Sequence, residues 1–151
     1  VSSWDILNGK EVNGDCVVLG GGLVGTETAE YVASKGYKVT IVEMMDKIAA
    51  QESATVMPLI EADFKKHGVI SYVNTKVNEI KNNVIYAQNT SDNTSVEIKA
   101  DTIINALGSK KNVIDESKLN VPFVYVGDCS GEKTADIASA IRTGYKAGNE
   151  L

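Results

Sequence analysis

The sequence is poor in the residues that mark several kinds of protein site. Its two cysteines, Cys16 and Cys129, lie far apart and form no C-x-x-C pair or metal-ligand cluster, so we expect both to be small buried apolar residues. The single histidine, His67, precedes Gly68 and is typical of a helix C-terminus. The sequence therefore predicts no metal site and no histidine catalyst.

Long apolar runs and excess positive charge are also missing. No stretch approaches the ~20 apolar residues of a membrane span, and the N-terminus lacks a basic start followed by an apolar run. The net charge is -5, whereas a nucleic-acid surface needs a basic patch. We therefore expect a cytoplasmic protein without a membrane or nucleic-acid partner. The 151 residues are one domain's worth, and the only tryptophan, Trp4, is expected to anchor an N-terminal arm over residues 1–13.

Glycine, by contrast, is present in the most informative place. Residues 17–19 are an apolar strand pattern, and Gly20, Gly22 and Gly25 follow in a G-x-G-x-x-G spacing before a helical pattern. Gly20 permits a tight turn, Gly22 lets the backbone approach a pyrophosphate, and Gly25 lets the helix pack on the strand. The helix N-terminus points free amide groups at the phosphates. The cofactor contacts predicted here are Gly20, Gly21, Gly22, Leu23, Val24 and Gly25.

The context of this turn favours a dinucleotide. A strand is predicted at Asp15 to Leu19, then a helix that stops at Gly36, then a second strand at Lys38 to Val42. Glu43 follows about twenty residues past the glycines, where a carboxylate accepts hydrogen bonds from an adenosine ribose. We expect NAD(H) rather than NADPH, because Glu43 would repel a ribose phosphate and the next two residues, both methionine, supply no cation. An ordinary strand-turn-helix of an α/β sheet is the alternative.

The remaining pattern indicates an α/β fold. A helix at about Glu52 to His67 and a third strand at Val69 to Val73 predict a Rossmann-like, doubly wound parallel sheet. Asn82-Asn83 is a hairpin signal between short apolar segments, so a three-stranded antiparallel meander is expected as a crossover. The last predicted elements are a return to the parallel sheet at Asp101 to Gly108, a buried strand at Phe123 to Asp128, and an amphipathic helix at Lys133 to Leu151 with Ile137, Ala138, Ile141 and Tyr145 on its inner face.

Several of these motifs together resemble a known family. They are the glycine turn with Glu27 two places after Gly25, the meander, Asn105-Ala106-Leu107-Gly108, Val124-Tyr125-Val126-Gly127-Asp128 and the closing stretch 135–145. In combination they resemble the two-dinucleotide flavoproteins related to pyridine nucleotide-disulfide reductases. Within that group the chain is most similar to the C-terminal part of NADH:flavin oxidoreductases of the old-yellow-enzyme type, whose relatives include 2,4-dienoyl-CoA reductase and trimethylamine dehydrogenase.

The resemblance implies two segments. Residues 1–109 would be an NAD(H)-binding domain with an N-terminal arm, and residues 110–151 a C-terminal remnant of an FAD-binding domain, packed as part of the same unit. Asp128 would hydrogen-bond a flavin ribityl hydroxyl, with a helix-capping acid at a strand-end turn as the alternative. Gly108, Gly127 and Asp128 complete the predicted cofactor contacts.

The resemblance also implies that the sequence is a fragment. No flavin fingerprint precedes Val1, and no barrel pattern or iron-sulfur cysteine cluster is present. FAD would therefore be held mainly by the flavin domain and barrel of a longer parent enzyme, which are the expected partners. The chain would position NADH for hydride transfer to that flavin and would be inactive alone; the alternative is a non-catalytic module that holds ADP or a dinucleotide structurally.

Glu27 is the one catalytic candidate. By resemblance it would lie near the nicotinamide and the flavin edge. From chemistry alone it is equally a first-turn acid that suits the helix dipole. The sequence leaves these two interpretations open.

Overall fold

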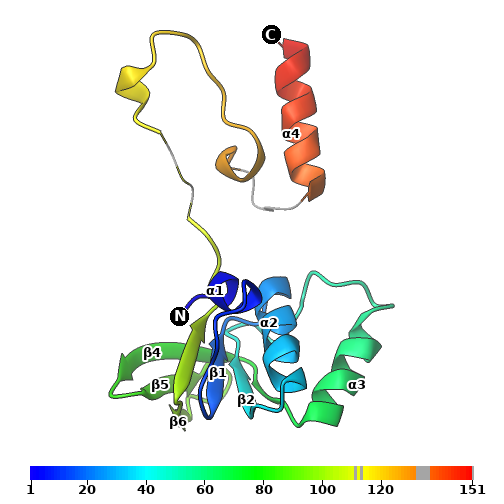
Figure 1. Cartoon of the computed structure of the whole chain (residues 1–151), viewed down its shortest axis with the longest axis vertical. Helices are drawn as coiled ribbons and strands as arrows, with labels where there is room; N and C mark the ends of the chain where they lie inside the picture. Colours follow the sequence, from blue (N-terminus) through cyan, green and yellow to red (C-terminus); the bar gives the residue numbers. More distant parts are fainter. Residues whose placement is uncertain (111, 113, 132–136, 151) are drawn as a thin grey trace. The chain divides into compact units, whose positions relative to one another are not determined.

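The computed structural model describes residues 1–110, 112, 114–131 and 137–150 of the chain. These residues form two compact units, Val1–Gly108 and Ser109–Leu151 (Figure 1). The division falls beside the expected boundary between residues 109 and 110. Which cofactor domain each segment represents, and whether the two pack together, stay predictions.

A parallel sheet forms the centre of the first unit. Its strands are ordered β3-β2-β1-β7, and they are β1 (Cys16–Leu19), β2 (Val39–Val42), β3 (Ile70–Tyr72) and β7 (Thr102–Asn105). Helix α2 (Leu23–Ser34) connects β1 to β2, and α3 (Met57–His67) connects β2 to β3. The predicted start of α3 at Glu52 is wrong: the helix begins at Met57, beside Pro58, whose missing amide hydrogen suits the first turn.

An antiparallel meander lies between β3 and β7 along the chain, as predicted. Its strands, in spatial as in chain order, are β4 (Thr75–Lys81), β5 (Val84–Asn89) and β6 (Ser95–Lys99). Asn82 and Asn83 form the first turn with φ values of 50° and 61°. Positive φ at both central residues matches the twist of paired strands, and asparagine tolerates it better than most residues. The turn sets the register in which Lys81 pairs with Val84.

Helices, parallel sheet and meander form three layers with a core on each side of the parallel sheet. Side chains alternate along β1, so that Cys16 and Val18 pack with the helices, whereas Val17 and Leu19 pack with the meander. The helix-side core also holds Ile6, Val12, Ala29, Val32, Ala33, Val39, Ile41, Phe64 and Ile104, and the meander-side core holds Val42, Ile85 and Ala100. The predicted α/β fold, with its parallel sheet and antiparallel crossover, is therefore confirmed.

The N-terminal arm contains a short helix, α1 (Ser3–Leu7), in addition to the predicted elements. The Ser2 hydroxyl accepts a hydrogen bond from the Asp5 amide at 3.1 Å, and the Asp5 carboxylate accepts one from the Ser2 amide at 3.0 Å. This capping box fixes the start of the helix. Ile6 is 1% exposed and packs in the core, but Trp4 is 60% exposed. The expected anchoring role of Trp4 is therefore wrong, because α1 turns Ile6 toward the sheet instead.

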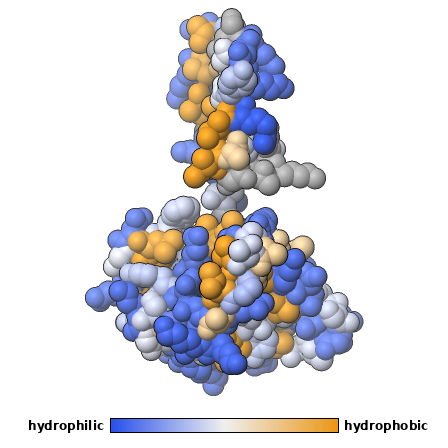
Figure 2. Space-filling model, turned by 90° about the vertical axis from the view of Figure 1, so that its right-hand side faces the viewer, coloured by the Kyte–Doolittle hydropathy of each residue, from blue (hydrophilic) through white to orange (hydrophobic). Residues whose placement is uncertain are grey.

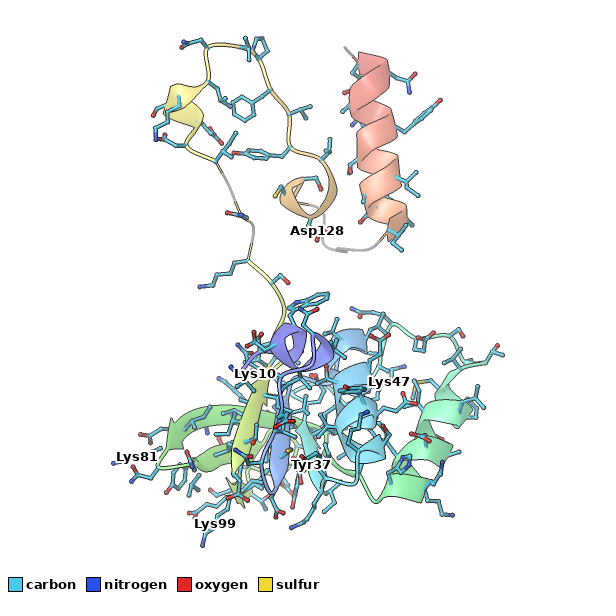
Figure 3. The ribbon with its side chains drawn as sticks, viewed as in Figure 1. Lys10, Tyr37, Lys47, Lys81, Lys99 and Asp128 are labelled. Atoms are coloured by element: carbon cyan, nitrogen blue, oxygen red, sulfur yellow. The ribbon has the colours of Figure 1, made fainter. Side chains whose placement is uncertain are left out.

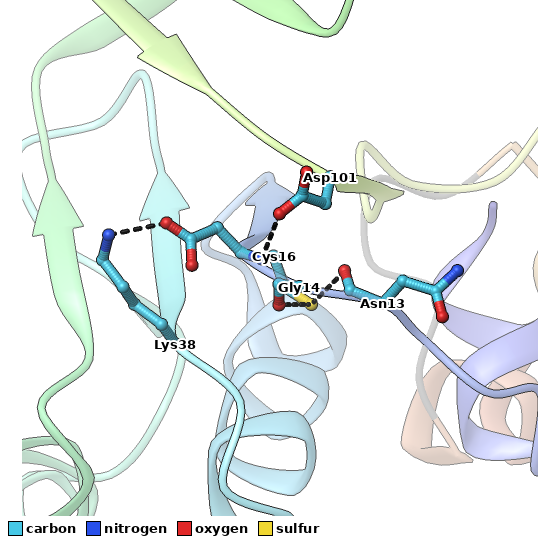
Figure 4. A network of polar contacts seen from close by, with 6 residues as sticks. Asn13, Gly14, Cys16, Lys38 and Asp101 are labelled. Atoms are coloured by element: carbon cyan, nitrogen blue, oxygen red, sulfur yellow. Dashed lines mark hydrogen bonds and ion pairs between the residues drawn. The ribbon is translucent and has the colours of Figure 1, made fainter.

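A polar network joins the amino ends of β1 and β7 (Figure 4). The Asp15 amide donates to Asp101 Oδ2 at 2.8 Å, and Lys38 Nζ lies 2.6 Å from Asp15 Oδ2. Gly14 has a φ of +53°, and a Cβ there would overlap the Asp101 carboxylate. The close approach of this backbone to Asp101 therefore favours glycine at position 14. Cys16 is buried as predicted, and this burial raises the pKa of its thiol.

The described residues of the second unit form two short 3₁₀ turns and one helix. They are η1 (Glu116–Lys118), η2 (Gly127–Cys129) and α4 (Ile137–Glu150). The predicted strand at residues 123–128 is wrong, because residues 123–126 pair with no strand among the described residues and η2 follows at once. A strand needs such a neighbour to satisfy its backbone groups. Cys129 is half-buried, not buried as expected.

Within the second unit, helix α4 exposes the face that was expected to point inward. Buried Ser139 and half-buried Thr143 lie on the side that contacts η2, where the Thr143 hydroxyl accepts a hydrogen bond from the Gly127 amide at 2.9 Å. Figure 2 shows apolar surface on this unit, and the exposed face consists of Ile137, Ala138, Ile141 and Tyr145. Residues 133–136 and 151 of the predicted helix lie outside the described residues. Among the helices of the described ranges, none is long and apolar enough to cross a membrane.

Candidate functional site

A cavity of about 490 Å³ opens where β1, β2 and β7 end. Ligands of open parallel sheets bind at this carboxyl edge, beside the strand on whose two sides the connections diverge. That strand is β1, which has β2 on one side and β7 on the other. Four predicted residues line the cavity, Gly20, Gly22, Glu43 and Gly108, together with Val42, Met44, Thr75, Lys76, Val77, Ala106 and Leu107.

The three glycines of the turn have different structural duties. Gly20 has a φ of +99°, and a Cβ there would lie 2.7 Å from the carbonyl oxygen of Ala106. A Cβ on Gly25 would overlap the carbonyl oxygen of Gly20, so this residue permits the close packing of α2 on the turn. A Cβ on Gly22 would meet nothing within 4 Å. Gly20 and Gly25 are therefore needed by the fold itself, and Gly22 faces open space.

The N-terminus of α2 borders this open space. Gly22 is the N-cap residue, and no side chain caps the helix with a hydrogen bond there. Leu23 and Val24 are the first two helical residues. The first amides of a helix have no partner within the helix, so they form a ready site for an anion. Gly21 differs, because its amide is occupied by Glu43 and a Cβ on it would lie 2.9 Å from both Glu43 and Ile48 side-chain atoms.

Glu43 is bound to the surrounding backbone at both ends. Its Oε2 accepts from the Gly21 amide at 2.5 Å, and its Oε1 accepts from the Met45 amide at 2.7 Å. Its backbone amide donates to the Tyr72 carbonyl at 2.8 Å, and its carbonyl accepts from the Thr75 amide at 2.8 Å. Each carboxylate oxygen keeps a further lone pair for a ligand hydroxyl. The motif indicated a ribose acceptor, but it did not show that Glu43 also holds the glycine turn in place.

Several lining residues escaped sequence reasoning. Thr75, Lys76 and Val77 begin β4, and their approach to Glu43 depends on the way the meander docks on the parallel sheet. Lys76 adds a positive charge to the cavity. The sequence-based expectation of NADH considered only the two methionines after Glu43 and did not include this charge. Lys81 and Lys99 end β4 and β6 and do not line the cavity (Figure 3). No local motif marks Lys76 apart from these lysines.

The remaining predicted residues lie elsewhere. Glu27 is exposed in the second turn of α2, which has no acid in its first turn, so the first-turn interpretation is wrong. Its position near a nicotinamide stays a prediction. Gly127 has a φ of +61°, and exposed Asp128 follows it on η2 of the second unit (Figure 3). A flavin contact of these two residues also stays a prediction.

Comparison with protein families and curated proteins gives clear matches. Residues 1–144 match the family model described as pyridine nucleotide-disulphide oxidoreductase. The chain is similar to a bilirubin reductase of Mediterraneibacter gnavus (strain CC55_001C), with 41% identity over 153 residues that cover 99% of this chain and 23% of the relative. It is also similar to an NADH oxidase of Thermoanaerobacter brockii, with 43% identity over 81 residues, 52% of this chain and 12% of the relative.

Solved structures of a reductase and a dehydrogenase also match nearly the whole chain. A 2-naphthoyl-CoA reductase matches with a TM-score of 0.82 and 28% identity, over 100% of this chain and 23% of that one. Histamine dehydrogenase from Rhizobium sp. 4-9 has a TM-score of 0.81 at 19% identity, over 99% of this chain and 26% of that one, which supports the fold alone. The chain thus spans about a quarter of the length of such relatives. It belongs to the pyridine nucleotide-disulphide oxidoreductase family, as a dinucleotide-binding domain of the flavoprotein type.

Proposed function

We propose that this chain binds NADH in the cavity at the carboxyl edge of the parallel sheet and orients it for hydride transfer to a flavin held by the rest of a longer flavoenzyme. The observation that carries the proposal is that the glycine turn and Glu43 line one cavity beside the N-terminus of α2. A dinucleotide uses these features for its pyrophosphate and its adenosine ribose.

Each part of the cavity fits a part of the cofactor. The open space at Gly22 lets a pyrophosphate reach the first amides of α2. Glu43 would accept hydrogen bonds from ribose hydroxyls, and the wall at residues 106–108 would face the nicotinamide half, because a dinucleotide crosses the sheet at β1. When bound, the reduced nicotinamide supplies the hydride, so the task of this chain is binding and orientation.

The relatives support a redox role within a larger protein. Two of them are named bilirubin reductase and NADH oxidase, and both are much longer than this chain. By the resemblance, the partners would be a flavin domain and a barrel. Residues 110–151 would supply one side of the flavin site, with Gly127 and Asp128 near the flavin.

Titration of the purified chain with NADH and NADPH tests the proposal. We expect tighter binding of NADH, because the Glu43 carboxylate repels a ribose phosphate. Lys76 lines the same cavity and offsets part of this repulsion, so Lys76→Ala should widen the preference, whereas Lys81→Ala, on the same strand and outside the cavity, should leave it unchanged. Absence of NADH binding contradicts the proposed function, and equal affinity for the two cofactors contradicts the role of Glu43.

A further inference from the structure

Asn105, the last residue of β7, links the N-terminal arm to the chain segment that follows the strand. Its backbone amide donates to the Val1 carbonyl oxygen at 2.8 Å, and its carbonyl oxygen accepts from the Ser3 hydroxyl at 2.9 Å. Its side-chain Oδ1 accepts from the Leu107 amide at 3.0 Å. Ser3 is 1% exposed, so its hydroxyl is shielded from competing water. The backbone of Asn105 is thus bound to the N-terminal arm, and its side chain binds the Leu107 amide.

The segment that Asn105 holds is a wall of the proposed cofactor cavity. Ala106, Leu107 and Gly108 all line it. Leu107 is 69% exposed, and Gly108 follows with a φ of +93°, so packing does little to fix these two residues. The Ala106 amide donates to the Leu19 carbonyl at 2.8 Å, which ties the start of the wall to β1. The next tie along the chain is the bond between the Asn105 side chain and the Leu107 amide.

We propose that Asn105 is a positioning residue for the nicotinamide half of the dinucleotide, acting by fixing Leu107 at the cavity wall. This inference rests on the proposed binding of NADH. Strands β2 and β7 flank β1 on opposite sides, so a ligand with its ribose at Glu43 extends toward residues 106–108. Loss of the Asn105 side chain therefore weakens contacts at one end of the cofactor only. ADP, which lacks the nicotinamide half, does not depend on that wall.

The experiment compares NADH and ADP titrations of the full chain and of three variants. Asn105→Ala removes the acceptor of the Leu107 amide, and Asn105→Ser restores a hydroxyl that bonds the same amide more weakly. Asn89→Ala is the matched control, because Asn89 Oδ1 accepts from the amide two residues on, Ser91, at 2.8 Å in the meander and away from the cavity. Thermal unfolding of each variant measures its stability.

We expect Asn105→Ala to weaken NADH binding about threefold to tenfold, which is the range for one intramolecular hydrogen bond, and to leave ADP binding unchanged. Asn105→Ser should recover part of the loss, and Asn89→Ala should change neither affinity. Equal loss of NADH and ADP binding, or unchanged NADH binding in Asn105→Ala, overturns the inference while leaving the proposed function intact. Failure of the unsubstituted chain to bind NADH overturns both.

Discussion

The Glu43 carboxylate binds two backbone amides, those of Gly21 and Met45, and lines the cavity as well. A substitution there changes the glycine turn and the ligand contact together. The structural bonds already hold the side chain in place, so a ribose hydroxyl would meet an acceptor that needs no reorganisation. A single substitution of Glu43 therefore needs a control that separates loss of the ligand contact from disturbance of the glycine turn.

Replacement of Glu43 should weaken NADH binding strongly. A hydrogen bond to a charged group contributes roughly 1.5–3 kcal/mol, so Glu43→Ala should raise the Kd about tenfold to a hundredfold or somewhat more. Glu43→Gln keeps one acceptor oxygen and removes the charge, so it should lose less NADH affinity and bring NADPH closer to NADH. Glu79→Gln, an exposed acid of β4 outside the cavity, is the control. A normal Kd for Glu43→Ala would show that this side chain is structural only.

Gly22 and Gly25 separate ligand binding from folding. Gly22→Val should abolish NADH binding and leave thermal unfolding unchanged, because its Cβ meets nothing in the protein but would stand where the pyrophosphate approaches. Gly25→Ala should destabilise the fold by about 1–3 kcal/mol or more, because its Cβ would overlap the Gly20 carbonyl. Calorimetry and NADH titration of both variants make the test. Unfolding of Gly22→Val, or full NADH affinity in that variant, would contradict the assignment.

At the scale of elements, sequence reasoning works where a segment carries its own local signal. The strand, glycine turn and helix around Gly20 form as predicted, and so does the hairpin at Asn82 and Asn83, whose positive φ values explain the residue choice. Sequence reasoning fails where a tertiary neighbour, such as an adjacent strand, determines the structure of a segment. The apolar residues 123–126 look like a strand, but no described strand pairs with them. The candidate site shows the same limit, because Lys76 lines the cavity only through the docking of the meander on the parallel sheet.

Helix α4 shows that a correctly predicted amphipathic pattern does not identify the surface that the helix contacts. Its amphipathic pattern is real, yet the polar side with Ser139 and Thr143 makes the contact with η2, and Ile137 and Ile141 remain 80% and 67% exposed. A pattern tells which face is apolar, but not which surface covers it. Exposed apolar faces of this kind mark interaction sites, and a partner domain of the proposed longer enzyme would cover this one.

The separation into two units predicts that nucleotide binding belongs to the first one. The helix-side core ends at Ala106, the meander-side core ends at Ile103, and the cavity lining ends at Gly108. A chain of residues 1–108 should therefore unfold cooperatively and bind NADH within about twofold of the full chain, because every residue that lines the cavity belongs to the first unit. Circular dichroism and titration of this shorter chain provide the measurement. A large loss of affinity would mean that the second unit completes the site.

For the whole molecule, we expect binding without turnover. The purified 151-residue chain should be colourless and should not oxidise NADH even with added FAD, because a flavin that is not held against the nicotinamide lacks the positional advantage of a bound pair. An N-terminally extended protein that restores the flavin domain and barrel should oxidise NADH. Turnover by the short chain above a protein-free control would contradict the fragment interpretation. An extended protein that binds NADH without turnover would favour a structural nucleotide module.

The meander between β3 and β7 also has a consequence for the order of folding. Residues 16–19 of β1 pair with residues 102–105 of β7, so this pairing closes most of the first unit into a loop. The pairings of β4 with β5 and of β5 with β6 are local in sequence. Local contacts form sooner because they close shorter loops, and a folded meander shortens the remaining one. We therefore expect the cavity, whose walls come from the ends of β1, β2 and β7 and from the start of β4, to be completed in the last step of folding.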